Sequence, residues 1–230
     1  MTRDGVELSE FLREHLRKKR IVLAGVSWGS MLGVHIVKAR PDLFYAYVGS
    51  GQAVNQGVFK AVAYRQLLAE ARARNDRKAI GELEANGSPP YDTVAKATVH
   101  TKWANAYEAG QPSTAQLASI VLFDSEAGVG DLRDYIRGLG TSQDHFREAV
   151  DREDLRALGR RVEVPFFIFQ GAKDNVTPIG PVREYFDTII SPRKEMVIIP
   201  GGGHNVAITM SGEFLKLLVD RVKPLALESR

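Results

Sequence analysis

The sequence contains no cysteine, no long hydrophobic run and no strong excess of charge of one sign. The lack of cysteine excludes disulfides and thiolate metal sites. No apolar run approaches the length that a membrane span needs. The net charge of +3 is small beside 31 basic and 28 acidic residues. We therefore expect neither a nucleic-acid nor a membrane partner.

Several sequence signals of location and cofactor binding are also missing. The first residues, Met1 to Gly5, are polar and lack the apolar segment of a signal peptide, so we expect a cytoplasmic location. There is no Walker A motif, no H-E-x-x-H and no G-x-G-x-x-G after a strand. The glycines at 201–203 lack the following Lys-Ser/Thr and helix of a phosphate loop. We expect no metal and no organic cofactor.

What is present is a regular alternation of helical and strand patterns near both ends of the chain. The order is helix, strand, helix, strand over residues 6–19, 21–24, 30–39 and 43–48. After a long interval the pattern returns as strand, helix, strand and helix over residues 164–169, 182–189, 195–199 and 214–222. This order predicts an α/β fold with a mostly parallel sheet.

The middle of the chain, residues 53–158, is helix-rich and has few strand-like runs. Long helices are expected at 58–75 and 91–109, with breaks at 87–90 and 110–112. We therefore divide the chain into an α/β core, residues 1–52 and 159–230, and a helical insertion, residues 53–158.

The motif Gly-Val-Ser-Trp-Gly at residues 25–29 lies between the strand at 21–24 and a helical pattern. Strand, G-x-S-x-G and helix is the context of a serine nucleophile on a tight turn. Gly25 and Gly29 are expected to leave room for that turn. A G-x-S-x-G sequence also occurs by chance in loops. The strand before it and the helix after it favour Ser27 as a nucleophile.

A serine nucleophile needs a base, and the base needs an acid that orients it. With a G-x-S-x-G turn, the usual chain order is Ser, then Asp or Glu, then His. Asp174 follows the strand at 164–169, and His204 lies in a glycine-rich loop after the strand at 195–199. Asp174 alone would also suit a turn or a helix cap. Its place between Ser27 and His204 favours it as the acid of a triad.

The expected chemistry is hydrolysis through an acyl-enzyme on Ser27. The tetrahedral oxyanion then needs backbone or side-chain donors. One is expected to be the N–H of Trp28, the residue after the nucleophile. The second usually comes from a glycine-rich loop after an earlier strand, and no such loop precedes Ser27 in this sequence.

The chain resembles the proline iminopeptidase (prolyl aminopeptidase) branch of the α/β-hydrolase fold. The resemblance rests on residues 25–30 (G-V-S-W-G-S), 38–44 (K-A-R-P-D-L-F), 171–178 (G-A-K-D-N-V-T-P) and 192–195 (P-R-K-E). It implies a partial α/β-hydrolase fold with strands equivalent to the fifth to eighth, and a helical cap between the sixth and seventh. It also implies a serine peptidase that releases N-terminal residues, with Ser27, Asp174 and His204 as its triad.

In that family, acidic residues of the cap hold the free amine of the substrate. Glu70, Glu108 and Glu126 are candidates for this role, although surface charge is the simpler interpretation of each. Trp103 is a candidate to line a pocket, although packing in a core is the simpler interpretation.

The family also has an N-terminal portion with four further strands, and this chain begins at the helix before the fifth. The strand from Ile21 to Ala24 would then be an apolar sheet edge, which invites pairing. We expect a homodimer, or contact with a separate N-terminal piece, along that edge. Two other functions stay open. One is a carboxylesterase that uses the same triad on small esters, and the other is a truncated, weakly active or non-catalytic α/β-hydrolase-like protein.

Overall fold

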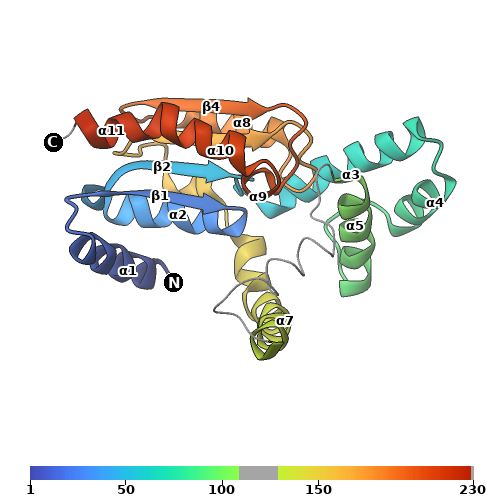
Figure 1. Cartoon of the computed structure of the whole chain (residues 1–230). Coiled ribbons are helices and arrows are strands. Elements are labelled where there is room, and N and C mark those ends of the chain that lie inside the picture. The colour runs from blue at the N-terminus through green and yellow to red at the C-terminus, as the bar shows by residue number, and fades with distance from the viewer. Residues whose placement is uncertain (109–128, 229–230) are drawn as a thin grey trace.

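The computed structural model describes residues 1–108 and 129–228. At its centre is one parallel sheet with the strand order β1-β2-β3-β4. The strands are β1 (Ile21–Val26), β2 (Phe44–Ser50), β3 (Phe166–Gly171) and β4 (Lys194–Ile199). Their carboxyl ends point toward the same edge of the sheet, where the chain leaves for the helical region (Figure 1). The predicted α/β class with a parallel sheet is confirmed.

Helices cover both faces of this sheet. One face is covered by α2 (Trp28–Ala39) and α8 (Ile179–Thr188). The other is covered by the C-terminal helices α9 (Val206–Thr209), α10 (Ser211–Leu217), η3 (Leu218–Val222) and α11 (Lys223–Glu228). The short helices η1 (Pro41–Leu43) and η2 (Leu155–Leu158) lead into β2 and toward β3.

The central strand β3 explains how the two cores form. Its residues are all buried, and their side chains alternate between the two faces of the sheet. Phe166 and Ile168 pack with α2 and α8, whereas Phe167 and Phe169 pack with the C-terminal helices. A continuous apolar run such as residues 166–169 is typical of a parallel sheet covered on both faces. Burial of each phenylalanine contributes about 1.5–3 kcal/mol.

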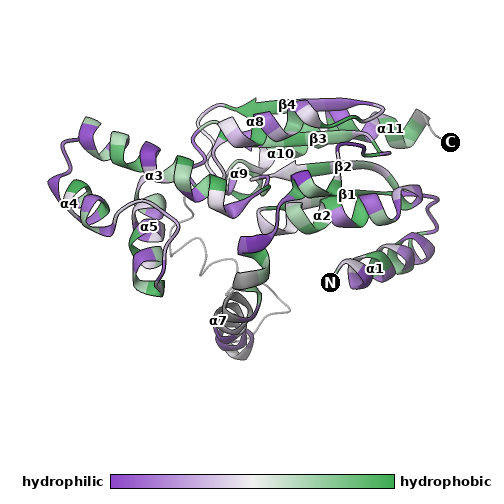
Figure 2. Ribbon diagram, turned by 180° about the vertical axis from the view of Figure 1, so that it is seen from behind, coloured by the Kyte–Doolittle hydropathy of each residue, from purple (hydrophilic) through white to green (hydrophobic). Residues whose placement is uncertain are grey.

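The strand β1 pairs with β2 on one side only among the described residues. Ala24 and Val26 of β1 are exposed. Helix α1 (Thr2–His15) packs against α2 and leaves Leu8 and Phe11 exposed, 57% and 60% respectively. Figure 2 shows α1 with both green and purple residues, whereas the strand β3 is mostly green.

Between β2 and β3 the chain forms a helical region. Its described helices are α3 (Gln56–Ala73), α4 (Arg77–Asn86), α5 (Val94–Tyr107) and α7 (Val129–Arg152). The first three pack on one another around Leu67, Leu83 and Trp103, and they extend away from the sheet (Figure 1). Every helix of the described residues is too short or too polar to span a lipid bilayer. The boundaries proposed for a cap at residues 53–158 stay a prediction.

Several helix limits differ from those expected. The first helix begins at Thr2 and ends at His15, and α4 is a separate helix that the sequence analysis did not resolve. It begins because the Asp76 side chain accepts a hydrogen bond from the N–H of Ala79, at 3.0 Å. The closing helix starts at Ser211, passes through the π turn η3 and continues to Glu228. The break expected at 110–112 lies outside the described residues.

Candidate active site

Ser27 occupies the turn between β1 and α2. Its backbone has φ 54° and ψ −123°, a strained conformation for a residue with a side chain. The turn needs glycine at position 25, because a Cβ there would lie 2.4 Å from the carbonyl oxygen of Gly29. A Cβ at Gly29 itself would meet nothing within 4 Å. The expectation that both glycines make room for the turn therefore holds for Gly25 and is wrong for Gly29.

The backbone of Ser27 is held by two neighbouring residues. Its N–H donates to the carbonyl of Ser50 at the end of β2, at 2.9 Å. Its own carbonyl accepts from the hydroxyl of Ser30, at 2.5 Å. Trp28 is the first residue of α2 and is half-buried. Its N–H has no acceptor within the helix, because the first amides of a helix have no partner there, and the helix dipole favours negative charge at this end.

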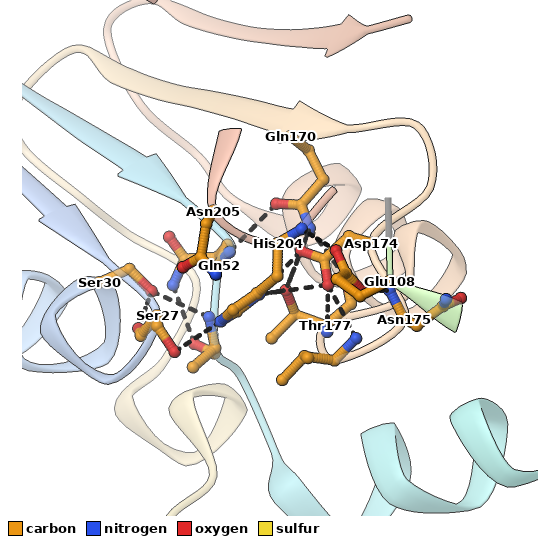
Figure 3. Close-up of polar contacts among 12 residues, drawn as sticks. Ser27, Ser30, Gln52, Glu108, Gln170, Asp174, Asn175, Thr177, His204 and Asn205 are labelled. Atoms are coloured by element: carbon orange, nitrogen blue, oxygen red, sulfur yellow. Dashed lines mark hydrogen bonds and ion pairs between the residues drawn. The ribbon is translucent and has the colours of Figure 1, made fainter. Parts of the chain in front are cut away.

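The imidazole of His204 connects the other two predicted residues. Its Nε2 lies 2.8 Å from Ser27 Oγ, and its Nδ1 lies 3.0 Å from Asp174 Oδ2 (Figure 3). Ser27, Asp174 and His204 each follow a strand of the sheet, β1, β3 and β4. A carboxylate only accepts hydrogen bonds, so Nδ1 carries the proton toward Asp174 and Nε2 is left to accept from the serine hydroxyl.

The carboxylate of Asp174 is fully buried and accepts several hydrogen bonds besides that of His204. The N–H groups of Val176 and Thr177 donate to Oδ1, at 2.9 and 2.7 Å. The Thr177 hydroxyl and the Gln170 side-chain amide donate to Oδ2, at 2.6 and 2.7 Å. Together these donors fix the orientation of the carboxylate toward the imidazole.

His204 is itself buried, with 7% of its surface exposed. Burial lowers its pKa, but the hydrogen bond and the charge of Asp174, together with the charge of Glu108, outweigh burial, so the pKa of His204 is raised. The environment therefore favours the imidazolium, which is the form that a base reaches after it takes a proton.

A buried polar network that the sequence analysis missed lies beneath these residues. The N–H of Gln52 donates to Gln170 Oε1 at 3.1 Å, and Tyr47 OH donates to Gln52 Oε1 at 2.7 Å. The Ser30 hydroxyl, which donates to Ser27, accepts from the N–H of Ala53 at 2.9 Å. The signal available in the sequence was glutamine at or just beyond the end of a buried strand, where an amide side chain needs buried partners.

Gly51 allows the imidazole to occupy its place. It has φ +52°, and a Cβ there would lie 2.8 Å from Cε1 and 2.9 Å from Nδ1 of His204. Both the backbone conformation and the close approach therefore require glycine.

The weaker sequence candidates lie in different surroundings. Glu108 is buried beside the triad, and its carboxylate accepts hydrogen bonds from the N–H groups of His204 and Asn175.

The other candidates lie away from the triad or outside the described residues. Trp103 packs in the core of the helical region, and its indole N–H donates to Glu82 at 2.9 Å. Glu70 is exposed and pairs with Arg74. Glu126 lies outside the described residues.

The other histidines have other environments. His15 is exposed and stacks on Phe11, and His35 lies 3.0 Å from Glu153. His100 is buried against Tyr91, and burial lowers its pKa to about 4. His145 is exposed.

In the described part of the chain, no cluster of three or more His, Cys, Asp or Glu side chains could hold a metal ion.

The family model described as alpha/beta hydrolase fold matches residues 4–210. The chain belongs to the alpha/beta hydrolase fold family. A curated relative of this chain is named "Probable aminopeptidase YbaC", from Bacillus subtilis (strain 168). It is 24% identical over 220 residues, which are 94% of this chain and 69% of the relative.

Two solved structures show the same fold at lower sequence identity. The proline iminopeptidase-related protein TTHA1809 from Thermus thermophilus has a TM-score of 0.59 and 15% identity, over 98% of this chain and 72% of the TTHA1809 chain. A structure described as a thermophilic esterase has a TM-score of 0.57 and 17% identity, over 96% of this chain and 73% of the esterase chain. The relatives thus carry both aminopeptidase and esterase names.

Proposed function

We propose that this protein is a serine hydrolase that cleaves small acyl substrates through an acyl-enzyme on Ser27. The observation that carries the proposal is the continuous contact from Ser27 Oγ through the His204 imidazole to the buried carboxylate of Asp174. The strained turn at Ser27 and the membership of the alpha/beta hydrolase fold family support it.

In the first half of the reaction, His204 Nε2 takes the proton of Ser27 Oγ as the oxygen attacks the substrate carbonyl carbon. Asp174 keeps the proton on Nδ1 and stabilises the imidazolium. The carbonyl oxygen becomes the oxyanion, and the N–H of Trp28 donates to it. The intermediate collapses when Nε2 gives its proton to the leaving amine or alcohol, whose bond to the carbonyl carbon breaks.

In the second half, water takes the place of the leaving group. His204 Nε2 removes a proton from the water as its oxygen attacks the acyl carbon of the ester on Ser27. The second tetrahedral intermediate then expels Ser27 Oγ, which recovers the proton from Nε2. The products are a carboxylic acid and the free enzyme, and Asp174 holds the same orientation in both halves.

The first substrate class that we propose is the N-terminal residue of a small peptide, because the curated relative is named as an aminopeptidase. A second candidate is a small carboxylic ester. The position of Glu108 favours this second class, because the carboxylate offered for the substrate amine already accepts two backbone N–H groups. The named esterase structure supports the same alternative.

The test compares hydrolysis of p-nitrophenyl acetate, p-nitrophenyl butyrate and proline p-nitroanilide by the wild-type protein and by Ser27→Ala. We expect the wild type to hydrolyse at least one of these substrates. Ser27→Ala should lose about 10³–10⁶-fold in kcat for that substrate, as removal of a triad member does. A preference for the anilide assigns the aminopeptidase, and a preference for the short esters assigns the esterase.

The matched control is Ser211→Ala, which changes an exposed serine at the start of α10. This variant should keep the wild-type rates. Equal rates for Ser27→Ala and the wild type on every substrate would contradict the proposed function.

A further inference from the structure

We propose that Glu108 is a positioning residue that ties the end of α5 to both loops of the triad, and that it is not a ligand for a substrate amine. The proposal rests on the proposed function, because it concerns how Asp174 and His204 are held for the reaction. It also gives a specific role to the helical region that precedes β3.

The contacts of Glu108 reach the two loops separately. Its Oε2 accepts the N–H of Asn175, in the loop after β3, at 2.9 Å. Its Oε1 accepts the N–H of His204, in the loop after β4. One carboxylate therefore bridges the residue next to the acid and the backbone of the base itself (Figure 3). Because these backbone groups are fixed by the same side chain, the separation of Asp174 and His204 depends on it.

Glu108 is connected to the helical region through the residue before it. The carbonyl of Tyr107 accepts the side-chain N–H of Asn175 at 3.0 Å, so α5 makes a further hydrogen bond to the acid loop. The hydroxyl of Tyr107 donates to Asp76 at the start of α4, at 2.8 Å, and its ring packs at 5.7 Å from that of Trp103. These contacts hold the loop after β3 against the core formed by α3, α4 and α5.

Burial argues against direct binding of a substrate ammonium by Glu108. Only 8% of the residue is exposed, and each carboxylate oxygen already accepts an amide. Because so little of the residue is exposed, a substrate amine would have little access to the carboxylate while both loops are in place. The structure thus favours a role in which the carboxylate acts through His204 and Asn175.

The negative charge of Glu108 also acts on the His204 imidazole. It is one of the groups that raise the pKa of His204, after Asp174. The pKa of Glu108 is itself raised, chiefly by burial. Among the described residues, the side chains that hydrogen-bond to the His204 imidazole or its backbone are those of Ser27, Asp174, Thr177 and Glu108. Removal of the Glu108 charge should therefore lower the pH at which His204 becomes a base.

The experiment compares Glu108→Gln and Glu108→Asp with the wild type. Glutamine keeps one acceptor oxygen and presents an NH₂ group to the other amide, so one hydrogen bond and the charge are lost. We expect kcat to fall about tenfold, KM to change less than about threefold, and the acid limb of the kcat/KM profile to move to lower pH. Glu108→Asp keeps the charge and should leave that limb near its wild-type position.

Amide hydrogen exchange provides a readout that needs no activity. In Glu108→Gln we expect faster exchange at Asn175 and His204 than in the wild type, with unchanged exchange in the central strands. The matched control is Glu84→Gln, which removes an exposed carboxylate that pairs with Arg72 in the same helical region. It should change neither the exchange nor the pH profile.

Two results would overturn the proposal. The first is wild-type exchange and a wild-type pH profile in Glu108→Gln. The second is an increase in KM of more than about tenfold, confined to substrates with a free amine and with kcat unchanged, which would make Glu108 an amine ligand. If the wild-type protein proves inactive on every substrate, the proposed function fails, and the exchange measurement still decides whether Glu108 holds the loops.

Discussion

The backbone N–H of Gln52 donates a hydrogen bond to the side-chain oxygen of Gln170, at 3.1 Å, inside the protein. Gln52 follows β2 and lies beside the residues that hold the Ser27 turn, whereas the Gln170 side-chain amide donates to Asp174 at 2.7 Å. This bond therefore joins the nucleophile side of the site to the acid side through the backbone of Gln52 and the side chain of Gln170, and both residues are fully buried.

Replacement of Gln170 by methionine tests this connection. The side chain keeps its length but loses its polar atoms, which leaves the Gln52 N–H without its acceptor and removes one donor from Asp174. We expect the free energy of unfolding to fall by about 1–3 kcal/mol and kcat/KM to fall about tenfold. Urea denaturation and steady-state kinetics measure the two effects.

The control is Gln66→Met, which makes the same change at an exposed position of α3. We expect its stability to stay within about 0.5 kcal/mol of the wild type. If Gln170→Met were as stable and as active as Gln66→Met, the buried network would have no role in holding the site.

Substitution of Gly51 by alanine tests the close approach of the imidazole. The new Cβ would lie 2.8 Å from His204 Cε1, so the ring must move away from Ser27 or Asp174. We expect kcat/KM to fall at least tenfold, in addition to a cost of about 1–2 kcal/mol for a side chain at positive φ. Gly87→Ala is the matched control, because Gly87 has φ +74° and nothing within 4 Å of its Cβ position. It should be destabilised while it keeps the wild-type kcat/KM.

The pH dependence follows from the raised pKa of His204. The base must be neutral to accept the proton of Ser27, so kcat/KM should rise with pH and reach half of its plateau above pH 6.5. Asp174→Asn should move this midpoint down and lower kcat by about 10⁴-fold, because the amide no longer selects the correct tautomer. A midpoint below pH 6.5 in the wild type would contradict the assignment.

The contribution of His204 to the free energy of unfolding should fall as the pH rises, whereas kcat/KM should increase. Because the folded-state pKa of His204 lies above its usual value of 6.5, its contribution is complete below pH 6.5 and is lost as the pH rises through the raised value. The difference in Tm between the wild type and His204→Gln should therefore shrink as the pH is raised from about 6 to about 9. Thermal unfolding followed by circular dichroism provides this comparison.

The oligomeric state tests the expectation of a homodimer along β1. Within the described residues β1 has a partner on one side only, Ala24 and Val26 are exposed, and α1 exposes Leu8 and Phe11. Unpaired strand groups next to apolar side chains favour association. We propose a homodimer, which light scattering at micromolar concentration should detect as twice the chain mass of 25.4 kDa. A monomeric mass for the protein alone would be evidence against it.

The sequence was sufficient to predict the parallel sheet and the positions of Ser27, Asp174 and His204, because each follows a strand whose apolar run is visible locally. Other features depend on contacts between distant parts of the chain. Gln52 and Gln170 meet across 118 positions, and Glu108 meets His204 across 96. No local pattern predicts these pairs, because they depend on how α5 and the strand ends are placed in space.

A nucleophilic serine activated by a histidine reacts covalently with a fluorophosphonate, so we expect this probe to label Ser27. Intact-mass spectrometry of the wild type should show one adduct, and peptide mapping should place it on Ser27. The adduct should be absent from Ser27→Ala and should form at least about 10³-fold more slowly in His204→Gln. An unlabelled wild-type protein, or equal labelling of Ser27→Ala, would show that Ser27 is not an activated nucleophile.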